Sequence, residues 1–348
     1  MARIDLLNLE KTVISATLEG LKVCIYSNNS LGKTFQSCRF NKPLILSTEN
    51  GTNGISGVYK ISITKWEDFK SVVNQLTKES SFAQMYDRYN TIIIDVADRL
   101  AGMCEDYICN TNMVDKIADI PYGAGYTMMR KELDRVITKL SLSKYFVIFL
   151  AHEMYQEREE LGADGKPVKY IYTLPKDSDK PKSAMREIIN ICDVTTRLVS
   201  NGIDENNEVV LSSAYNAETK YFFARSRFTK MKSFIEKFTK EAYEEALLDG
   251  MQKQAELFGQ EAVSYEEKKE SESKMKPKVD LPTVLDSLKL LMTKLYEVKL
   301  QDDVNRLVVK HIGEGKRVSE CSEYEIDKLT ALELALLDLV EDKGVKLD

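Results

Sequence analysis

Short apolar runs alternate with amphipathic segments along the first two thirds of the 348-residue chain. The runs are rich in β-branched and aromatic residues and nearly continuous, a pattern typical of strands that are covered on both faces of a sheet. They occupy residues 21–27, 43–48, 91–96, 145–152, 193–199, 208–214 and 220–226. Helix-like segments separate the earlier runs, which predicts an α/β fold with a mostly parallel sheet. The last runs follow one another closely, which predicts an antiparallel extension at one edge of the sheet.

The pattern changes near residue 235. Residues 236–280 begin as a predicted helix and become a charged stretch with few apolar residues, which is typical of a solvated linker. From residue 281 onward, apolar residues recur at helical spacing. We therefore predict an α/β core at 1–235, a helix and charged linker at 236–280, and a small α-helical domain at 281–348.

Composition limits the candidate functions. The net charge is -6, so binding to nucleic acid would need a local basic patch or a multimer that concentrates basic residues. The six cysteines form no CxxC pair and there are only two histidines, which favours reduced thiols over a zinc site. No run approaches the roughly 18 apolar residues of a membrane span. The first residues lack the pattern of a signal peptide. We expect a cytoplasmic protein that does not contact membranes.

A phosphate-binding motif follows the first apolar run. In P-loop proteins the pattern G-x-x-x-x-G-K-[ST] surrounds the phosphates with backbone N–H groups, while its lysine reaches the β and γ phosphates and its hydroxyl binds magnesium. The sequence G-K-T at residues 32–34 fits this pattern directly, and a chance G-K-T at the start of a helix is the alternative. The motif predicts ATP and Mg²⁺ as ligands. The predicted nucleotide-binding residues are Ser27, Asn28, Asn29, Ser30, Leu31, Gly32, Lys33 and Thr34.

Two positions of this loop differ from the glycine-rich pattern. Ser27 stands at the first position, and Ser30 stands at the fourth, where many such loops have glycine. Glycine lets a loop adopt left-handed backbone conformations that other residues avoid. Asn28 and Asn29 tolerate these conformations better than most residues do. The two serines therefore bear on the rate of hydrolysis more than on nucleotide binding.

Two carboxylates follow later apolar runs. Asp95 ends a run as the Walker B acid of P-loop enzymes does, so we predict that Thr34 and Asp95 hold the magnesium. Asp95 could instead cap the next helix, and Asp98 is interpreted as such a local cap. Glu49 follows the second apolar run, at the edge where open α/β sheets bind ligands. We predict that Glu49 orients and deprotonates the attacking water, with a solvated glutamate in a turn as the alternative.

Three basic side chains complete the predicted catalytic set of Glu49 and Lys33. His152 ends the fourth apolar run at the same edge and can sense the γ phosphate, although a histidine at this place can also be structural. Arg225 and Arg227 are two residues apart on a predicted strand and so project from one side. They can act on the γ phosphate of a neighbouring subunit, as an arginine finger does, or be ordinary surface arginines.

Between about residues 10 and 235, the chain resembles the phage AAA-type nucleotide-binding proteins, the RecA-core ATPases of the Sak-type single-strand annealing and recombination group. The resemblance rests on the segments LKVCIYSNNSLGKT, KPLILSTENGTNGISGV, ITKWEDF, TIIIDVADRL, PYGAGYTMMRKELDRVITKL, YFVIFLAHE and KYFFARSRF. It implies a RecA-like P-loop core. It also implies roles for the matching residues: phosphate and magnesium binding by Lys33 and Thr34, the Walker B acid Asp95, the catalytic glutamate Glu49, the polar sensor His152, and a positive pair, Arg225 and Arg227, that enters the adjacent subunit.

The leading hypothesis is a phage ATPase in the cytoplasm of the bacterial host. It would assemble as a homo-oligomeric ring or filament on single-stranded DNA, with ATP and Mg²⁺ between subunits, and would assist recombination or annealing. A phage single-strand-binding or replication protein is a candidate partner. The alternative is a nucleotide-gated scaffold that hydrolyses little ATP and recruits replication or recombination partners through its C-terminal helices. A replicative helicase-like motor is a third reading.

Single-stranded DNA is bound in grooves that combine positive charge with aromatic stacking. One segment of the chain has this composition, although a solvated loop can have it as well. The candidate DNA contacts are Tyr170, Tyr172, Lys176, Lys180 and Lys182.

Overall fold

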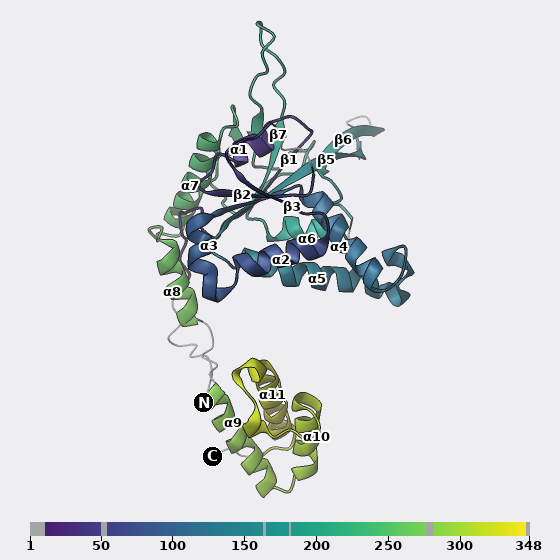
Figure 1. The fold of residues 1–348 in the computed structure, drawn as a ribbon, viewed down its shortest axis with the longest axis vertical. Coiled ribbons are helices and arrows are strands. Elements are labelled where there is room, and N and C mark those ends of the chain that lie inside the picture. The colour runs from purple at the N-terminus through teal and green to yellow at the C-terminus, as the bar shows by residue number, and fades with distance from the viewer. Residues whose placement is uncertain (1–10, 50–53, 163–164, 181, 276–280, 346–348) are drawn as a thin grey trace. The chain divides into compact units, whose positions relative to one another are not determined.

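The computed structural model describes residues 11–49, 54–162, 165–180, 182–275 and 281–345. It divides into two compact units, one of residues 13–268 and one that contains the C-terminal helices. The first unit is an α/β domain built on a single large sheet, and the second is helical (Figure 1).

Parallel strands form the centre of the sheet. Strand β1 (Lys22–Ser27) lies between β5 (Phe146–Leu161) and β7 (Val194–Val199) and is parallel to both. Next to β5 lies β4 (Thr91–Asp95), followed by β2 (Pro43–Ser47) and β3 (Tyr59–Ser62), all parallel. Because these strands are parallel, their carboxyl ends meet at one edge, which carries the P-loop. The prediction of an α/β fold with a mostly parallel sheet is confirmed.

Short strands extend the sheet beyond β7. Strand β8 (Ser213–Tyr215) is antiparallel to β7, and β10 (Phe234–Ile235) is antiparallel to β8. Strand β9 (Arg225–Ser226) also pairs with β7 in the antiparallel direction. The predicted antiparallel extension is therefore present. Its strands are shorter than the apolar runs indicated, because most of 208–212 and 220–224 lies outside the ladder.

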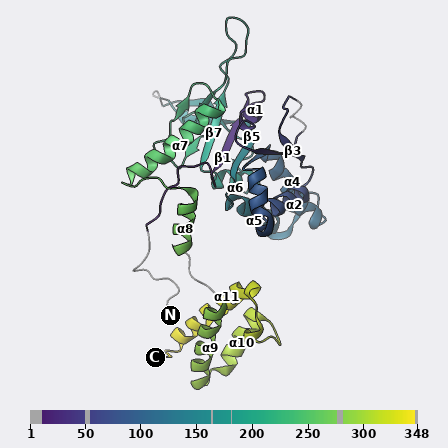
Figure 2. The same cartoon turned by 60° about the vertical axis from the view of Figure 1, so that its left-hand side comes forward.

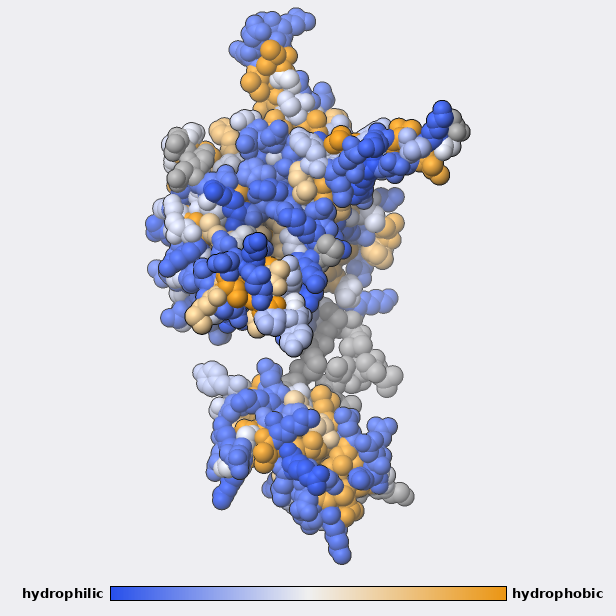
Figure 3. All heavy atoms as spheres, turned by 90° about the vertical axis from the view of Figure 1, so that its right-hand side faces the viewer, coloured by the Kyte–Doolittle hydropathy of each residue, from blue (hydrophilic) through white to orange (hydrophobic). Residues whose placement is uncertain are grey.

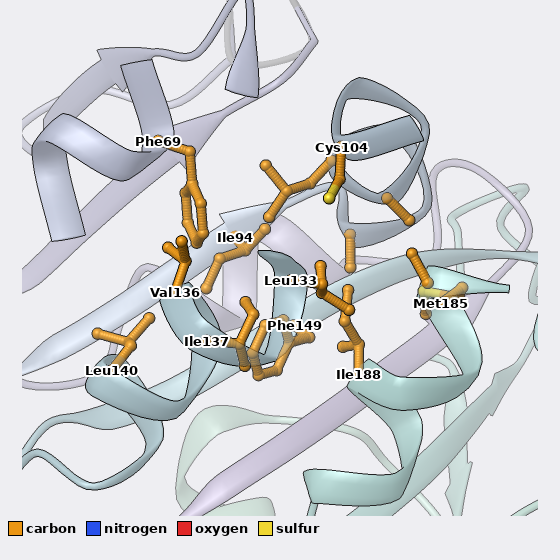
Figure 4. Close-up of a cluster of buried hydrophobic side chains, with 14 of the residues drawn as sticks. Phe69, Ile94, Cys104, Leu133, Val136, Ile137, Leu140, Phe149, Met185 and Ile188 are labelled. Atoms are coloured by element: carbon orange, nitrogen blue, oxygen red, sulfur yellow. The ribbon is translucent and has the colours of Figure 1, made fainter. Parts of the chain in front are cut away.

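Helices cover both faces of the sheet. On one face α2 (Trp66–Leu76), α4 (Ala97–Thr111), α5 (Ala124–Ser141) and α6 (Ala184–Ile191) pack their apolar sides on the strands (Figure 4). The other face is covered by α7 (Lys240–Leu257) (Figure 2). Successive residues along a strand point to opposite faces of the sheet, so alternate residues contribute to the two cores. The shorter helices are α1 (Lys33–Ser37) and α3 (Phe82–Arg88).

Helix α7 corrects the predicted domain boundary at 235. Its residues Tyr243, Leu247 and Met251 are buried in the same core cluster as β1 residues. The α/β unit therefore continues to residue 268, because one face of the sheet would be bare without α7.

The predicted charged linker is also partly helical. Helix α8 (Tyr265–Met275) occupies most of the charged stretch. Ser264 and Glu267 form a capping box: the hydroxyl accepts from the Glu267 amide, and the carboxylate accepts from the Ser264 amide. This cap and ion pairs one turn apart, such as Lys269–Glu272, stabilise a helix without an apolar face. Residues 276–280 of the predicted linker lie outside the described residues.

The described part of the C-terminal unit contains α9 (Leu281–Glu297), α10 (Gln301–Ile312) and α11 (Ile326–Asp342). The apolar stripe along α9 packs against α11. Along this stripe, every third or fourth residue of α9 is buried. Helical spacing of apolar residues thus places a second core here, separate from that of the α/β unit. No helix among the described residues combines the length and apolarity that crossing a membrane requires.

Candidate nucleotide-binding site

The loop between β1 and α1 is tight and contains two left-handed residues. Ser30 has φ 64° and Gly32 has φ 85°. Gly32 accepts this conformation without steric cost, whereas a side chain at Ser30 makes it unfavourable by roughly 1–2 kcal/mol. We expected Asn28 and Asn29 to adopt the left-handed backbone conformations that glycine would allow. Neither residue does so. The strain of this loop therefore falls on Ser30.

Lys33 folds back onto the loop. Its ammonium group donates to the carbonyl of Ser27 (3.1 Å), to the hydroxyl of Ser27 (2.8 Å) and to the carbonyl of Asn28 (2.8 Å). Burial lowers the pKa of Lys33 to about 8, against the opposing effect of Asp95 and other nearby carboxylates. The ammonium group is therefore still mostly charged at pH 7, and its donors are held at the centre of the loop, where a phosphate can accept them.

Thr34 and Asp95 meet as the sequence predicts. The Thr34 hydroxyl donates to Oδ2 of Asp95 over 3.2 Å. Asp95 ends β4 beside Ser47 of β2, and burial together with the charge of Glu49 raises the pKa of its carboxyl group. A hydroxyl and a carboxylate oxygen at this separation suit a hard cation such as Mg²⁺, whose charge would offset the burial of the carboxylate.

His152 lies between two carboxylates. Its backbone N–H donates to Oδ1 of Asp98 (3.1 Å), and its Nδ1 lies 3.0 Å from Oδ2 of the same residue. On the other side, Nε2 of His152 lies 3.9 Å from Oε2 of Glu49. The hydrogen bond to Asp98 raises the pKa of His152, which favours the imidazolium form. Asp98 therefore orients His152 so that one ring nitrogen faces Glu49 at the edge of the sheet that carries the P-loop.

Asp98 was interpreted from the sequence as a local helix cap, and the structure gives it a different role. Its side chain is fully buried, and it accepts from His152 and lies 3.5 Å from Nζ of Lys176. Burial raises the pKa of Asp98, but the hydrogen bonds from His152 outweigh this effect and lower it overall. Asp98 belongs to the site because β4 and β5 are neighbours, a pairing that local sequence does not reveal.

Glu49 borders an open cavity of about 560 Å³. The cavity is also lined by Thr48 and Arg99, and Nη1 of Arg99 lies 3.6 Å from Oε1 of Glu49. The carboxylate is partly exposed, so water can reach it. Arg99 is a further site residue that sequence reasoning missed, because an arginine in the first turn of a helix carries no motif.

Arg225 and Arg227 lie away from the P-loop of their own chain. The Arg225 guanidinium donates to carbonyl oxygens at the end of α6, including that of Ile189 at 2.6 Å. Arg227 pairs with Asp193 at 3.2 Å, just before β7. Both arginines therefore lie near the amino ends of the parallel strands. Their action on a neighbouring subunit stays a prediction.

The predicted DNA contacts differ in their accessibility. Tyr172 is buried, with the guanidinium carbon of Arg158 3.4 Å from its ring centre, so the prediction that Tyr172 stacks on bases is wrong. Lys176 contacts the candidate nucleotide site, because its backbone amide donates to the His152 carbonyl over 2.9 Å. The ammonium group of Lys182 lies 4.9 Å from the ring centre of Tyr126.

A strand, a phosphate loop and carboxylates at the ends of adjacent parallel strands define a P-loop nucleotide-binding protein. The family model described as AAA domain matches residues 19–228, so the chain belongs to the AAA domain family. The SPbeta prophage-derived uncharacterized protein YorG of Bacillus subtilis (strain 168) is 36% identical over 340 residues, which cover 97% of this chain and 99% of that protein. These matches confirm the resemblance to phage AAA-type proteins. Membership of the Sak-type annealing and recombination group stays a prediction.

Proposed function

We propose that this chain is a RecA-like phage ATPase that binds ATP and Mg²⁺ between the subunits of a homo-oligomer and acts on single-stranded DNA in recombination or annealing. The observation that carries the proposal is the convergence of Lys33, Thr34, Glu49, Asp95 and His152 at one edge of the sheet, where β1, β2 and β4 end and β5 continues past His152.

Each residue has a chemical task in this proposal. Lys33 exchanges its bonds to the loop oxygens for bonds to phosphate oxygens. Thr34 and Asp95 supply oxygen ligands for Mg²⁺, which would neutralise charge on the phosphates. Glu49 is partly exposed and accepts the proton of the attacking water. His152, oriented by Asp98, donates from its other nitrogen toward Glu49 and the terminal phosphate.

Lys176 connects this site to the proposed DNA-binding segment. Its amide is bonded to the His152 carbonyl, and its ammonium group lies near Asp98. A change in the position of His152 on loss of the terminal phosphate would therefore move the start of the segment that contains Lys180 and Lys182. This link supports the coupling of ATP turnover to DNA binding.

The test is to measure ATP binding and steady-state turnover, with and without single-stranded DNA, for the natural chain and for Lys33→Ala. We expect turnover that DNA stimulates. Removing the ammonium group should weaken ATP binding roughly ten- to a hundredfold, the loss of about 1.5–3 kcal/mol from charge-assisted hydrogen bonds. Lys131→Ala, an exposed lysine on α5, is the matched control and should behave as the natural chain does.

The nucleotide-gated scaffold is the second candidate. The departure of Ser27 and Ser30 from the glycine-rich pattern favours it, since it bears on the rate of hydrolysis more than on nucleotide binding. It predicts ATP binding without turnover under every DNA condition. The same measurements therefore distinguish the scaffold from the ATPase.

A further inference from the structure

A narrow hairpin of residues 200–212, here called the finger, projects from the sheet edge that carries the P-loop (Figure 1). It starts after the carboxyl end of β7 and ends before β8. At its base the Ser212 hydroxyl donates to the carbonyl of Leu31 in the P-loop over 2.9 Å. Its two arms pair in the antiparallel direction through Ile203 and Val209. The finger is therefore fixed at its base to the proposed nucleotide site.

One face of the finger is apolar. Paired residues of an antiparallel hairpin share a face, and so do residues two apart on one arm. Ile203, Val209 and Leu211 meet this condition, and they are 61%, 78% and 45% exposed. Figure 3 shows hydrophobic side chains below a hydrophilic tip on this projection. A lone two-stranded hairpin is only marginally stable in water, so a stripe of this kind is suited to burial against another molecule.

The tip of the finger is acidic and preorganised. The Asp204 carboxylate accepts from the amides of Asn206 (2.8 Å) and Glu208 (2.9 Å), and Asn207 takes the left-handed conformation that closes the turn. With Glu205, the tip carries three acidic side chains, and residues 200–212 contain no lysine or arginine. Such a tip repels nucleic acid and anionic membranes, and it favours a basic protein surface.

A complementary surface exists on the same chain. Residues 219–235, here called the basic segment, contain no acidic residue and carry Lys220, Arg225, Arg227, Lys230 and Lys232. Lys230 and Lys232 are exposed and form no ion pair with the residues that the structure describes. The exposed ring of Phe234, two residues after Lys232, adds apolar area beside these lysines. It offers both the charge and the apolar contact that the finger requires.

The part of the basic segment around Arg227 lies at the opposite end of the sheet from the finger, whereas its first residues, up to Phe223, lie beside Thr173 near the carboxyl ends. The Arg227 amide donates to the carbonyl of Asp193 (2.9 Å), and the Asp193 amide donates to the carbonyl of Lys22 (2.7 Å). These residues stand at the amino ends of β7 and β1, whereas the finger follows the carboxyl end of β7. Surfaces at opposite ends of one sheet meet in a head-to-tail contact between two copies.

We propose that the finger of one copy docks on the basic segment of the next copy. The contact is heterologous, so its repetition builds a ring or a filament. It would also bring Arg225 and Arg227 of one copy toward the P-loop of the other, since the finger is anchored there through Ser212. The inference rests on the proposed function in one respect, the placing of ATP between subunits.

A charge exchange on the full chain tests the contact. The first variant carries Glu205→Lys with Glu208→Lys, and the second carries Lys230→Glu with Lys232→Glu. Sedimentation at several protein concentrations, with Mg²⁺ and ATP, measures self-association. Each variant should weaken it by at least about tenfold, because like charges then face each other. All four changes in one chain should restore association to near that of the natural protein. The same should hold for a mixture of the two variants.

The matched control for the first variant is Glu67→Lys with Asp134→Lys, which changes the net charge by the same amount at exposed positions outside the finger and should associate normally. A natural chain that stays monomeric overturns the proposal. Reversed variants that assemble normally, or a fourfold variant no better than either parent, also overturn it. ATP binding is measured in parallel. If the natural chain does not bind ATP, the proposed function fails. If ATP binds but the charge exchange fails, only the docking contact is contradicted.

Discussion

The buried carboxylate of Asp98 and the partly exposed imidazole of His152 form a pair at the edge that carries the P-loop, and local motifs indicate only His152. G-K-T at 32–34, Asp95 and Glu49 could be predicted because strand ends and loop spacing are local signals. Asp98 and Arg99 could not, because their partners are set by which strands lie side by side. Sequence spacing likewise did not show that Tyr172 is buried, since its burial depends on the hairpin that β5 forms with β6 (Pro167–Pro175).

The pair predicts a pH effect. The pKa of His152 is raised from its usual 6.5 by Asp98, so the charged imidazole stabilises the folded chain. This contribution is fully present below that usual value and is lost as the pH rises through the raised pKa. Asp98→Asn should lower the pKa of His152 and remove this part of the pH dependence.

Ring signals of histidine in an NMR titration measure this effect. His311, the other histidine of the chain, lies in α10, and its ring signals serve as the internal reference. An unchanged titration of His152 in Asp98→Asn would mean that the pair does not set the charge of the imidazole.

At the scale of elements, the buried strands could be predicted and the exposed ones could not. The continuous apolar runs of β1, β2, β4 and β7 identify them, because these strands are covered on both faces. The sequence did not indicate β3, which is exposed throughout, or β6 (Pro167–Pro175), half of which is exposed. The linker interpretation of α8 failed because charge content alone does not exclude a capped helix with ion pairs.

Helix α7 provides a test at this scale. A chain that ends at residue 275 keeps α7 and should fold with Trp66 buried, whereas one that ends at residue 235 should not, because an apolar sheet face is then exposed. Trp66 is the single tryptophan, so its fluorescence during denaturation reports on the α/β core. Cooperative unfolding of the shorter chain would show that α7 is dispensable.

At the scale of the whole molecule, the chain combines a candidate nucleotide site, a finger beside it and a helical unit. The family match establishes an AAA domain. In the proposed function, the edge of the sheet supplies the residues for hydrolysis, and a neighbouring copy would supply Arg225 and Arg227. The finger and the basic segment explain how that copy could be placed. The helical unit has a core of its own.

The central claim is that Glu49 activates water in a complete ATP site. Steady-state ATP turnover of Glu49→Gln, measured at saturating ATP and Mg²⁺ with single-stranded DNA, tests it most directly, with Glu79→Gln as the control at an exposed position. The account predicts intact ATP binding and a fall in turnover of at least about a hundredfold, the usual effect of losing a general base. Equal turnover in Glu49→Gln and the natural chain, or no turnover in the natural chain, would contradict it.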